Sequence, residues 1–433
     1  MNQLNICIAG LGNVGSNLIS TIEKNKDFIA SKASFLINIK GISAKNPNKK
    51  RIFKLKNYKW FHNPLDLLTI NDCNVLIELI GDEKGISYNL VKKSLEKKIN
   101  VITANKALLA KNGSELFRLA EKNNVLLLYE AAVAGGIPII RTLKQNIFLH
   151  NIKRISGILN GTTNYILTTM FNKNKSFDEV LEIAKDKGYT TTNEAELDIG
   201  GLDSAHKLTL LTTLCFGSVI NYNNNNVTGL ANIETFDLIN AYKLGYKIKL
   251  ISEASLINNQ IYCVTEPKLI SINNPLANVD GVLNAIYLET DQLESLFLEG
   301  EGAGGKATAS SVISDLYEIA SNTNIKSLGY SNKKLINFKK LDISAIKSLY
   351  YLRIMTKDIA GVLSKITSYF KNFNISIEKI LQLPDTSNKE KPIPIIITTH
   401  EVQKKILMKV INKIEKQKFV LAKITIIQID KNL

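Results

Sequence analysis

The amino-acid sequence predicts an α/β fold built on a doubly wound parallel sheet, followed by two further units that mix helices and strands. Three observations lead to this prediction. In the first third of the chain, short apolar runs alternate with stretches of helical spacing. Several of these runs are apolar throughout, which is typical of strands covered on both faces. A glycine-rich loop, Gly10-Leu11-Gly12-Asn13-Val14-Gly15, joins the first apolar run to the first helical stretch.

The first unit is expected to hold five strands and three helices. The strands are predicted at residues 4–9, 35–43, 74–80, 100–103 and 125–129, and the helices at 14–24, 86–97 and 114–123. Because strands and helices alternate along most of this unit, the strands are expected to run parallel, with helices on both faces of the sheet.

The pattern changes near residue 137, where a second, α+β unit is expected. Its helices are predicted at residues 138–147, 163–171, 177–187 and 202–216, and its strands at 152–159, 247–253, 260–264, 282–287 and 296–298. A helix at 307–320 should return to the first unit. We therefore expect a dinucleotide-binding domain at 1–136 completed by 305–322, and a substrate and dimerisation domain at 137–304.

The last part of the chain predicts a separate small domain. Residues 323–347 are rich in Lys and Asn and are interpreted as a linker. From residue 348 to 433, strand-like and helical runs follow the order strand–helix–strand–strand–helix–strand, with the strands ending near 383 and 428. This order is that of the ferredoxin-like arrangement.

Composition excludes several classes of protein. The formal net charge is +16, but no basic stretch is interleaved with aromatic residues, which favours a lysine-rich surface over nucleic-acid binding. No signal peptide or run of membrane-spanning length is present, so a cytoplasmic protein without a membrane partner is expected. The four cysteines lack CxxC spacing and are predicted to be reduced and buried, without zinc.

The glycine-rich loop has the GxGxxG spacing of a Rossmann-type dinucleotide site. Gly10 permits the tight turn, Gly12 lets the backbone approach a pyrophosphate, and Gly15 allows close packing of helix and strand. Asn13 and Val14 open the following helix, whose N-terminus favours negative charge. The alternative is a glycine-rich turn without a ligand.

The residues at the end of the second expected strand indicate which form of the cofactor's ribose is bound. A carboxylate there would bind the 2′-hydroxyl and disfavour a 2′-phosphate. This chain has Lys45 after the strand and Arg51 a few residues later, with no carboxylate between them. We therefore expect NADP to be accepted, with NAD as the alternative, unless these cations belong to the general lysine excess.

Four further segments resemble one enzyme family, the homoserine dehydrogenases. They are Val101-Ile102-Thr103-Ala104-Asn105-Lys106-Ala107, Tyr129-Glu130-Ala131-Ala132-Val133-Ala134-Gly135-Gly136-Ile137-Pro138, Leu159-Asn160-Gly161-Thr162-Thr163-Asn164-Tyr165 and Leu197-Asp198-Ile199-Gly200-Gly201-Leu202-Asp203-Ser204-Ala205-His206-Lys207-Leu208. The resemblance covers residues 1–322. It implies the NAD(P)-dependent interconversion of L-aspartate 4-semialdehyde and L-homoserine, a step of threonine and methionine biosynthesis. Because the nucleotide loop lies at the start of the sequence, we expect a monofunctional enzyme.

The residues themselves indicate matching chemistry. Reduction of an aldehyde needs a hydride and a proton, and a lysine can supply the proton if burial or a second cation lowers its pKa. Asp203 and Lys207 are four residues apart and share one helix face. Leu208, Leu211 and Leu214 form an apolar stripe beside them, which would bury that helix. The alternative is a surface ion pair.

The resemblance also implies individual roles. Lys207 and Lys106 would be catalytic, although Lys106 also fits a simple helix start. Asp203 and Asp198 would bind substrate. The family's glutamate after Gly188-Tyr189 is replaced by threonines, and Glu194 or Glu196 is expected to take its place. Cofactor contacts are implied for Thr103, Lys106, Gly188 and Gly304, and a monovalent cation, usually Na⁺, for Glu130, Val133, Gly135 and Ile137.

Residues 349–429 resemble an ACT domain, a ferredoxin-like module that binds amino acids. The similar part is Asp358-Ile359-Ala360-Gly361-Val362-Leu363 with Asn374-Ile375-Ser376-Ile377. Such modules pair through their sheet edges, which implies a homodimer or homotetramer with threonine as the effector. A dimerisation module without a ligand is the alternative. For the whole chain, the alternatives are a non-catalytic amino-acid-binding regulator and a dehydrogenase of another small aldehyde.

Overall fold

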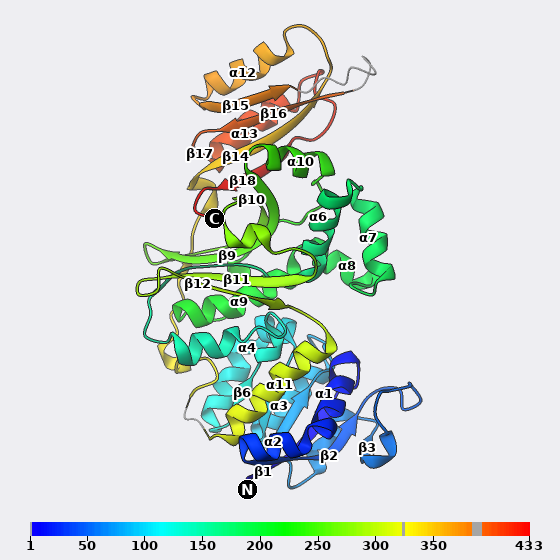
Figure 1. Ribbon diagram of the computed structural model, residues 1–433. Coiled ribbons are helices and arrows are strands. Elements are labelled where there is room, and N and C mark those ends of the chain that lie inside the picture. The colour runs from blue at the N-terminus through cyan, green and yellow to red at the C-terminus, as the bar shows by residue number, and fades with distance from the viewer. Residues whose placement is uncertain (1, 323–324, 383–391) are drawn as a thin grey trace.

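The computed structural model describes residues 2–322, 325–382 and 392–433 and arranges them as three successive units (Figure 1). The N-terminal unit comprises β1 to β6 with their helices, the middle unit residues 137–304, and the C-terminal unit residues 347–433. The start of the expected linker, at 323–324, and the expected strand end at 383 lie outside the described residues.

The N-terminal unit contains a six-stranded parallel sheet in the order β3-β2-β1-β4-β5-β6. This is the strand order of dinucleotide-binding sheets. The strands are β1 (Asn2–Ala9), β2 (Phe35–Ser43), β3 (Trp60–Phe61), β4 (Val75–Glu78), β5 (Asn100–Thr103) and β6 (Leu127–Leu128). The doubly wound parallel sheet predicted from the sequence is confirmed.

Five helices cover this sheet, and one of them comes from far along the chain. They are α1 (Asn13–Lys24), α2 (Lys26–Ala33), α3 (Ile86–Glu96), α4 (Lys106–Lys122) and α11 (Gly305–Ala320). Val312 and Leu316 of α11 share a core with Ile6 and Ile8 of β1, which confirms the predicted return of this helix. In Figure 1, α11 lies beside α1, and the two helices are in contact.

Two helices of this unit differ from expectation. The predicted helix at 114–123 begins eight residues earlier, at Lys106, because the side chain of Asn105 accepts the Leu108 N–H and caps the helix there. The unpredicted α2 has no fully buried residue, so it lacks the apolar stripe by which an amphipathic helix is recognised.

The middle unit combines helices with an antiparallel sheet in the order β12-β11-β7-β9-β10. Its strands are β7 (Ile152–Ile158), β8 (Asn226–Val227), β9 (Tyr246–Ile257), β10 (Gln260–Ser271), β11 (Leu283–Thr290) and β12 (Ser295–Glu301), and its helices are α5 (Ile139–Arg141), α6 (Gly161–Lys173), α7 (Phe177–Asp186), α8 (Thr192–Ile199), α9 (Leu202–Phe216) and α10 (Thr235–Lys243). The second, mixed unit predicted from the sequence is thus present.

Helix α9 is the buried helix of the middle unit, and it packs against α4 of the N-terminal unit. Leu108 and Leu109 of α4 lie in one apolar core with Leu208 and Leu211 of α9. Because both helices begin on the same side of this core, their first turns bring residues of two units together.

The C-terminal unit has the predicted strand and helix order. Its elements are β14 (Lys347–Thr356), α12 (Val362–Asn372), β15 (Ile377–Gln382), β16 (Ile393–Thr399), β17 (Val402–Gln403), α13 (Lys404–Ile414) and β18 (Thr425–Asp430). The main strands lie in the order β18-β14-β16-β15, as in ferredoxin-like sheets. The last strand begins at Thr425, six residues after Phe419, where the sequence pattern predicts its start.

The C-terminal unit is joined to the middle unit by its last strand. β18 pairs in parallel with β10, so the two sheets form one twelve-stranded sheet. The expected linker also packs on the middle unit, because β13 (Lys339–Lys340) pairs with β10 and Leu328 is buried. Residues 325–346 are therefore a structured part of the fold.

All four cysteines are free and buried, as predicted. The neighbouring Cys73 thiol and burial raise the pKa of the Cys7 thiol. No helix among the described residues is both long and apolar enough to cross a membrane.

Candidate active site

Lys207 lies inside the protein and is bound on two sides. Its Nζ donates to Oδ2 of Asp203 at 2.7 Å and to the carbonyl oxygen of Leu159 at 2.6 Å. The Lys207 side chain is only 9% exposed. The alternative of a surface ion pair is therefore wrong, and the ammonium is held at a fixed position beside the end of β7.

The local sequence explains how α9 presents this pair. Gly201 precedes the helix with φ +81°, a left-handed conformation that favours glycine and lets the chain turn from α8 into α9. Asp203 and Lys207 then lie one helical turn apart on the face toward β7, while Leu208 and Leu211 pack into the core.

Lys106 reaches the same carboxylate from the N-terminal unit. Its Nζ lies 3.0 Å from Oδ1 of Asp203. Lys106 is the first residue of α4, so it is a helix-start lysine and also part of the cluster. The charge of Asp203 raises the pKa of Lys106. Burial favours the neutral form of Asp203, but the two lysines hold the pKa of that carboxyl well below its ordinary value.

Asn160 connects the two aspartates of the cluster. Its Nδ2 donates to Oδ1 of Asp198 at 2.7 Å and to Oδ2 of Asp203 at 3.0 Å. Its Oδ1 accepts the Thr163 N–H at 2.9 Å and so caps α6. The other Asp198 oxygen accepts the Thr190 hydroxyl. Asn160 is thus both the cap of α6 and a contact of the site.

The two aspartates differ in their ionisation. Burial and the neighbouring charge of Asp203 raise the pKa of Asp198, while its hydrogen bonds from Asn160 and Thr190 act in the opposite direction. Two carboxylates of different pKa, one of them flanked by two lysines, are an arrangement typical of catalytic sites.

Glu194 lies at the edge of this cluster. Its side chain is exposed and accepts the Thr191 hydroxyl at 2.9 Å in the first turn of α8. Its negative charge is among the causes that raise the pKa of Lys106. The sequence missed α8 itself, because a short, largely polar helix has no clear apolar period.

The three glycines of the nucleotide loop meet the requirements predicted for them. A Cβ on Gly10 would lie 2.4 Å from the Leu79 carbonyl, and one on Gly15 would lie 2.1 Å from the Gly10 oxygen. A Cβ on Gly12 would meet nothing within 4 Å. Asn13 and Val14 are the first residues of α1, whose N-terminus has no side-chain cap. The loop thus leaves backbone N–H groups free for a phosphate.

A second glycine-rich turn lies against this loop. Gly304 has φ +115° and open space around its Cβ position. A Cβ on Gly305, the first residue of α11, would lie 2.5 Å from Oδ1 of Asn13. The structure therefore brings Gly304 beside the start of α1. Gly188, by contrast, lies in the middle unit between α7 and α8.

The remaining predicted cofactor residues are one exposed lysine and two side chains with hydrogen-bond partners. Lys45 is exposed after β2. Arg51 donates to the carbonyls of Asn46 at 2.6 Å and Lys49 at 2.8 Å and lies over the Trp60 ring, so its guanidinium shapes the loop that carries Lys45. The Thr103 hydroxyl donates to Glu78 at 2.6 Å.

Glu78 is a buried carboxylate at the end of β4 that the sequence analysis did not single out. Its Oε1 also accepts the N–H groups of Ile80 and Gly81. The carboxylate thus ties the end of β5 to the turn after β4, next to the nucleotide loop.

The four residues of the implied cation site lie on one bend. Glu130 is buried, and its carboxylate accepts the N–H groups of Ile140 and Arg141, both at 2.9 Å. Gly135 has φ +55°, and its carbonyl accepts the Ser311 hydroxyl. Val133 and Ile137 are buried around it. No group of three or more His, Cys, Asp or Glu in the described part of the chain is arranged to hold a metal ion.

Comparison with known proteins agrees with this geometry. Residues 10–130 match the family described as homoserine dehydrogenase, NAD binding domain, and residues 138–317 match the family described as homoserine dehydrogenase. The homoserine dehydrogenase of Neisseria gonorrhoeae is 34% identical, over 99% of both chains. The chain belongs to the homoserine dehydrogenase family.

Solved structures of homoserine dehydrogenases have the same fold. The enzyme from Thiobacillus denitrificans matches with a TM-score of 0.90 and 31% identity, over 100% of this chain and 99% of that one. A hyperthermophilic archaeal homoserine dehydrogenase in complex with NADPH matches with a TM-score of 0.61 and 27% identity, over 74% of this chain and 98% of that one. This chain is accordingly an oxidoreductase with an NAD(P)-binding domain, which favours an enzyme over a non-catalytic regulator. Its membership of the homoserine dehydrogenase family disfavours a dehydrogenase of another small aldehyde.

Proposed function

We propose that this homoserine dehydrogenase interconverts L-aspartate 4-semialdehyde and L-homoserine with Lys207 as the proton donor. The observation that carries the proposal is the binding of the Lys207 ammonium between Asp203 and the Leu159 carbonyl. An ammonium has three N–H groups, and these contacts use two of them. The third can donate to the aldehyde oxygen as it becomes an alkoxide. The bound nicotinamide supplies the hydride.

The charges around Lys207 suit an amino-acid substrate. Homoserine and the semialdehyde each carry one ammonium and one carboxylate. Asp198 and Glu194 supply negative charge for the ammonium, and Lys106, 38% exposed, supplies positive charge for the carboxylate. Asp203 holds both lysines, so its role is to position them as well as to complete the substrate site. Glu194 would replace the family glutamate that this chain lacks.

For the cofactor, we propose NADP in preference to NAD. Gly10, Gly12, Gly15 and the first residues of α1 fit a pyrophosphate, with Gly304 opposite them. Exposed Lys45 fits a 2′-phosphate, and Arg51 supports its loop. The archaeal neighbour is a complex with NADPH, which supports this choice.

A monovalent cation at the bend of residues 130–137 is a further part of the proposal. Burial raises the pKa of Glu130 to about 7, and no lysine or arginine in the described part of the chain forms an ion pair with it. A bound Na⁺ would offset this buried charge. Turnover in NaCl should exceed turnover in choline chloride of equal ionic strength, whereas equal rates would count against the cation.

For the C-terminal unit, we propose an ACT domain that binds threonine and pairs with a second copy of the chain in a homodimer or homotetramer. Gly361, with φ +87°, lies directly before α12, and a Cβ there would meet no atom within 4 Å. This open backbone suits the approach of a small amino acid. Calorimetric titration with threonine and a measured solution mass test both parts. Free buried cysteines are compatible with a cytoplasmic enzyme.

A substrate panel tests the proposed reaction. The purified full chain should catalyse the reduction of NADP⁺ by L-homoserine and show little turnover with lactate, malate or serine. Homoserine turnover at or below that of the other alcohols would overturn the proposal.

A further inference from the structure

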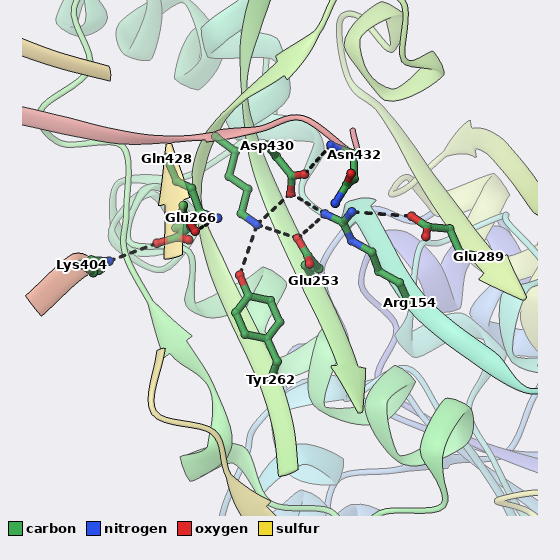
Figure 2. Close-up of polar contacts among 11 residues, drawn as sticks. Arg154, Glu253, Tyr262, Glu266, Glu289, Lys404, Gln428, Asp430 and Asn432 are labelled. Atoms are coloured by element: carbon green, nitrogen blue, oxygen red, sulfur yellow. Dashed lines mark hydrogen bonds and ion pairs between the residues drawn. The ribbon is translucent and has the colours of Figure 1, made fainter. Parts of the chain in front are cut away.

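A buried network of charged side chains joins the C-terminal unit to the middle unit (Figure 2). Its members are Arg154 of β7, Glu253 of β9, Lys268 of β10 and Asp430 of β18, and none of their side chains is more than 11% exposed. They therefore lie on four neighbouring strands of the twelve-stranded sheet, and only Asp430 comes from the C-terminal unit.

The contacts make Asp430 necessary for charge balance. Oε2 of Glu253 accepts from Arg154 at 2.8 Å and from Lys268 at 2.6 Å. Asp430 binds the same two cations, through a hydrogen bond from Arg154 and an Nζ–Oδ2 contact of 3.3 Å with Lys268. Glu289, farther out, is 30% exposed and lies 3.6 Å from Arg154. Without Asp430, two buried cations would share one buried carboxylate, which is unfavourable in the protein interior.

Arg154 lies on β7, and the residues directly after β7 bind Lys207 and its aspartates. β7 ends at Ile158, and the next two residues are Leu159, whose carbonyl binds Lys207, and Asn160, whose amide binds Asp198 and Asp203. β7 is also hydrogen-bonded to β9 and β11 on its two sides. A side chain fixed near the start of this strand thus helps to set where its end lies, because close-packed protein interiors transmit strain.

We propose that Asp430 is a positioning residue for the active site, acting through Arg154 and β7 on Leu159 and Asn160. The C-terminal unit thereby contributes one carboxylate to the arrangement of Lys207 and its aspartates. The inference rests on the proposed role of Lys207.

A second buried ion pair across the same boundary provides a matched control. Oδ1 of Asp237 in α10 accepts from Nε of Arg353 in β14 at 2.8 Å and from the Tyr351 hydroxyl at 3.0 Å. Asp237 is fully buried. This pair also joins the C-terminal unit to the middle unit, but α10 and β14 are not hydrogen-bonded neighbours of β7.

The test compares Asp430→Asn with Asp237→Asn in the full chain. Each change should lower the apparent Tm by a similar few degrees, because each removes one carboxylate from buried cations. After the loss of Asp237, Arg353 keeps the exposed Glu234, and after the loss of Asp430, the two cations share Glu253. Asp430→Asn alone should lower kcat/KM for homoserine, by roughly three- to thirty-fold, while the KM for NADP stays unchanged. Asp430→Glu, which keeps the carboxylate, should regain most of the loss.

A double variant tests the inference even if Asp430→Asn folds poorly. Lys268→Met combined with Asp430→Asn removes one charge of each sign, so it should restore Tm without restoring kcat/KM. Equal kcat/KM in Asp430→Asn and Asp237→Asn, or full recovery of kcat/KM in the double variant, would overturn the inference and leave the proposed function intact. Absence of homoserine turnover in the unchanged chain would overturn the proposed function and the inference with it.

Discussion

Lys106 and Asp203 form an ion pair of 3.0 Å across the boundary between the N-terminal and middle units. Lys106 opens α4 of one unit, and Asp203 lies in the first turn of α9 of the other. Because the same carboxylate also binds Lys207, the charged site exists only where the two units are packed together. The nucleotide loop and the cluster of Asp203, Lys207 and Lys106 are thereby held in one fixed relation.

The amide of Asn160 should control the acid side of the pH profile. Asn160→Ser keeps an oxygen to cap α6 but removes the N–H groups that bind Asp198 and Asp203. Since that hydrogen bond opposes the other causes that raise the pKa of Asp198, its loss should raise the pKa further. A carboxyl that must be ionised to bind the substrate ammonium loses activity as pH falls through its pKa. The acid limb of kcat/KM against pH should therefore move to higher pH.

Asn274→Ser is the matched control for this change. Asn274 also caps a short helix in the middle unit, by accepting the Leu276 N–H at 2.9 Å. The Asn274→Ser variant should therefore keep the acid limb of kcat/KM at the same pH as the unchanged enzyme. An acid limb at the same pH in Asn160→Ser and the unchanged enzyme would show that Asn160 is only a cap.

Gly12 and Gly15 should respond differently to alanine. Gly12 has φ −71° and open space at its Cβ position, so Gly12→Ala should fold normally and obstruct only the cofactor. Its KM for NADP should rise about ten-fold, a loss of about 1.4 kcal/mol. Gly15→Ala would place a methyl 2.1 Å from the Gly10 oxygen and should lower stability by roughly 1–3 kcal/mol. Thermal unfolding and cofactor titration distinguish the two variants. An unchanged KM for NADP in Gly12→Ala would refute the assignment of residues 10–15 as the cofactor loop.

Lys45 should distinguish the two cofactors. Lys45→Ala removes an exposed cation beside the expected 2′-phosphate, so the KM for NADP should rise roughly ten-fold while that for NAD stays constant. Lys24→Ala, at the opposite end of α1, serves as the control for net charge. Steady-state kinetics with both cofactors decide the matter, and equal changes for NADP and NAD would argue against a 2′-phosphate contact.

The fold could be predicted where the signal is local. Strands β2 and β5 and helix α9 have the bounds expected from the sequence, because apolar runs and a continuous buried helix leave little ambiguity. The short helices α8 and α10 could not be found in this way. In α10, Glu234 and Asp237 form a reciprocal cap, and Asp237 accepts hydrogen bonds from Tyr351 and Arg353 of the C-terminal unit.

In the site, too, contacts between residues close in sequence could be predicted, and contacts between distant residues could not. Asp203 and Lys207 follow from their spacing of four residues on one helix. Asn160 and Asp198 are separated by 38 residues, and their contact depends on how β7 and α8 pack. Arg154 and Asp430 are separated by 276 residues and meet only because β18 joins the sheet of the middle unit. Such pairs have no periodic signature in the sequence.

The central claim is that Lys207 donates the proton, and single-turnover reduction of aspartate 4-semialdehyde by NADPH tests it most directly. Lys249 is the matched control, a 3% exposed lysine of the same unit bound to Asp280, the Asn164 side chain and the Val279 carbonyl. Lys207→Met should slow the reaction by about 10²–10⁴-fold with unchanged NADPH affinity, whereas Lys249→Met should keep nearly the full rate. A Lys207→Met rate within three-fold of the unchanged enzyme would contradict the claim.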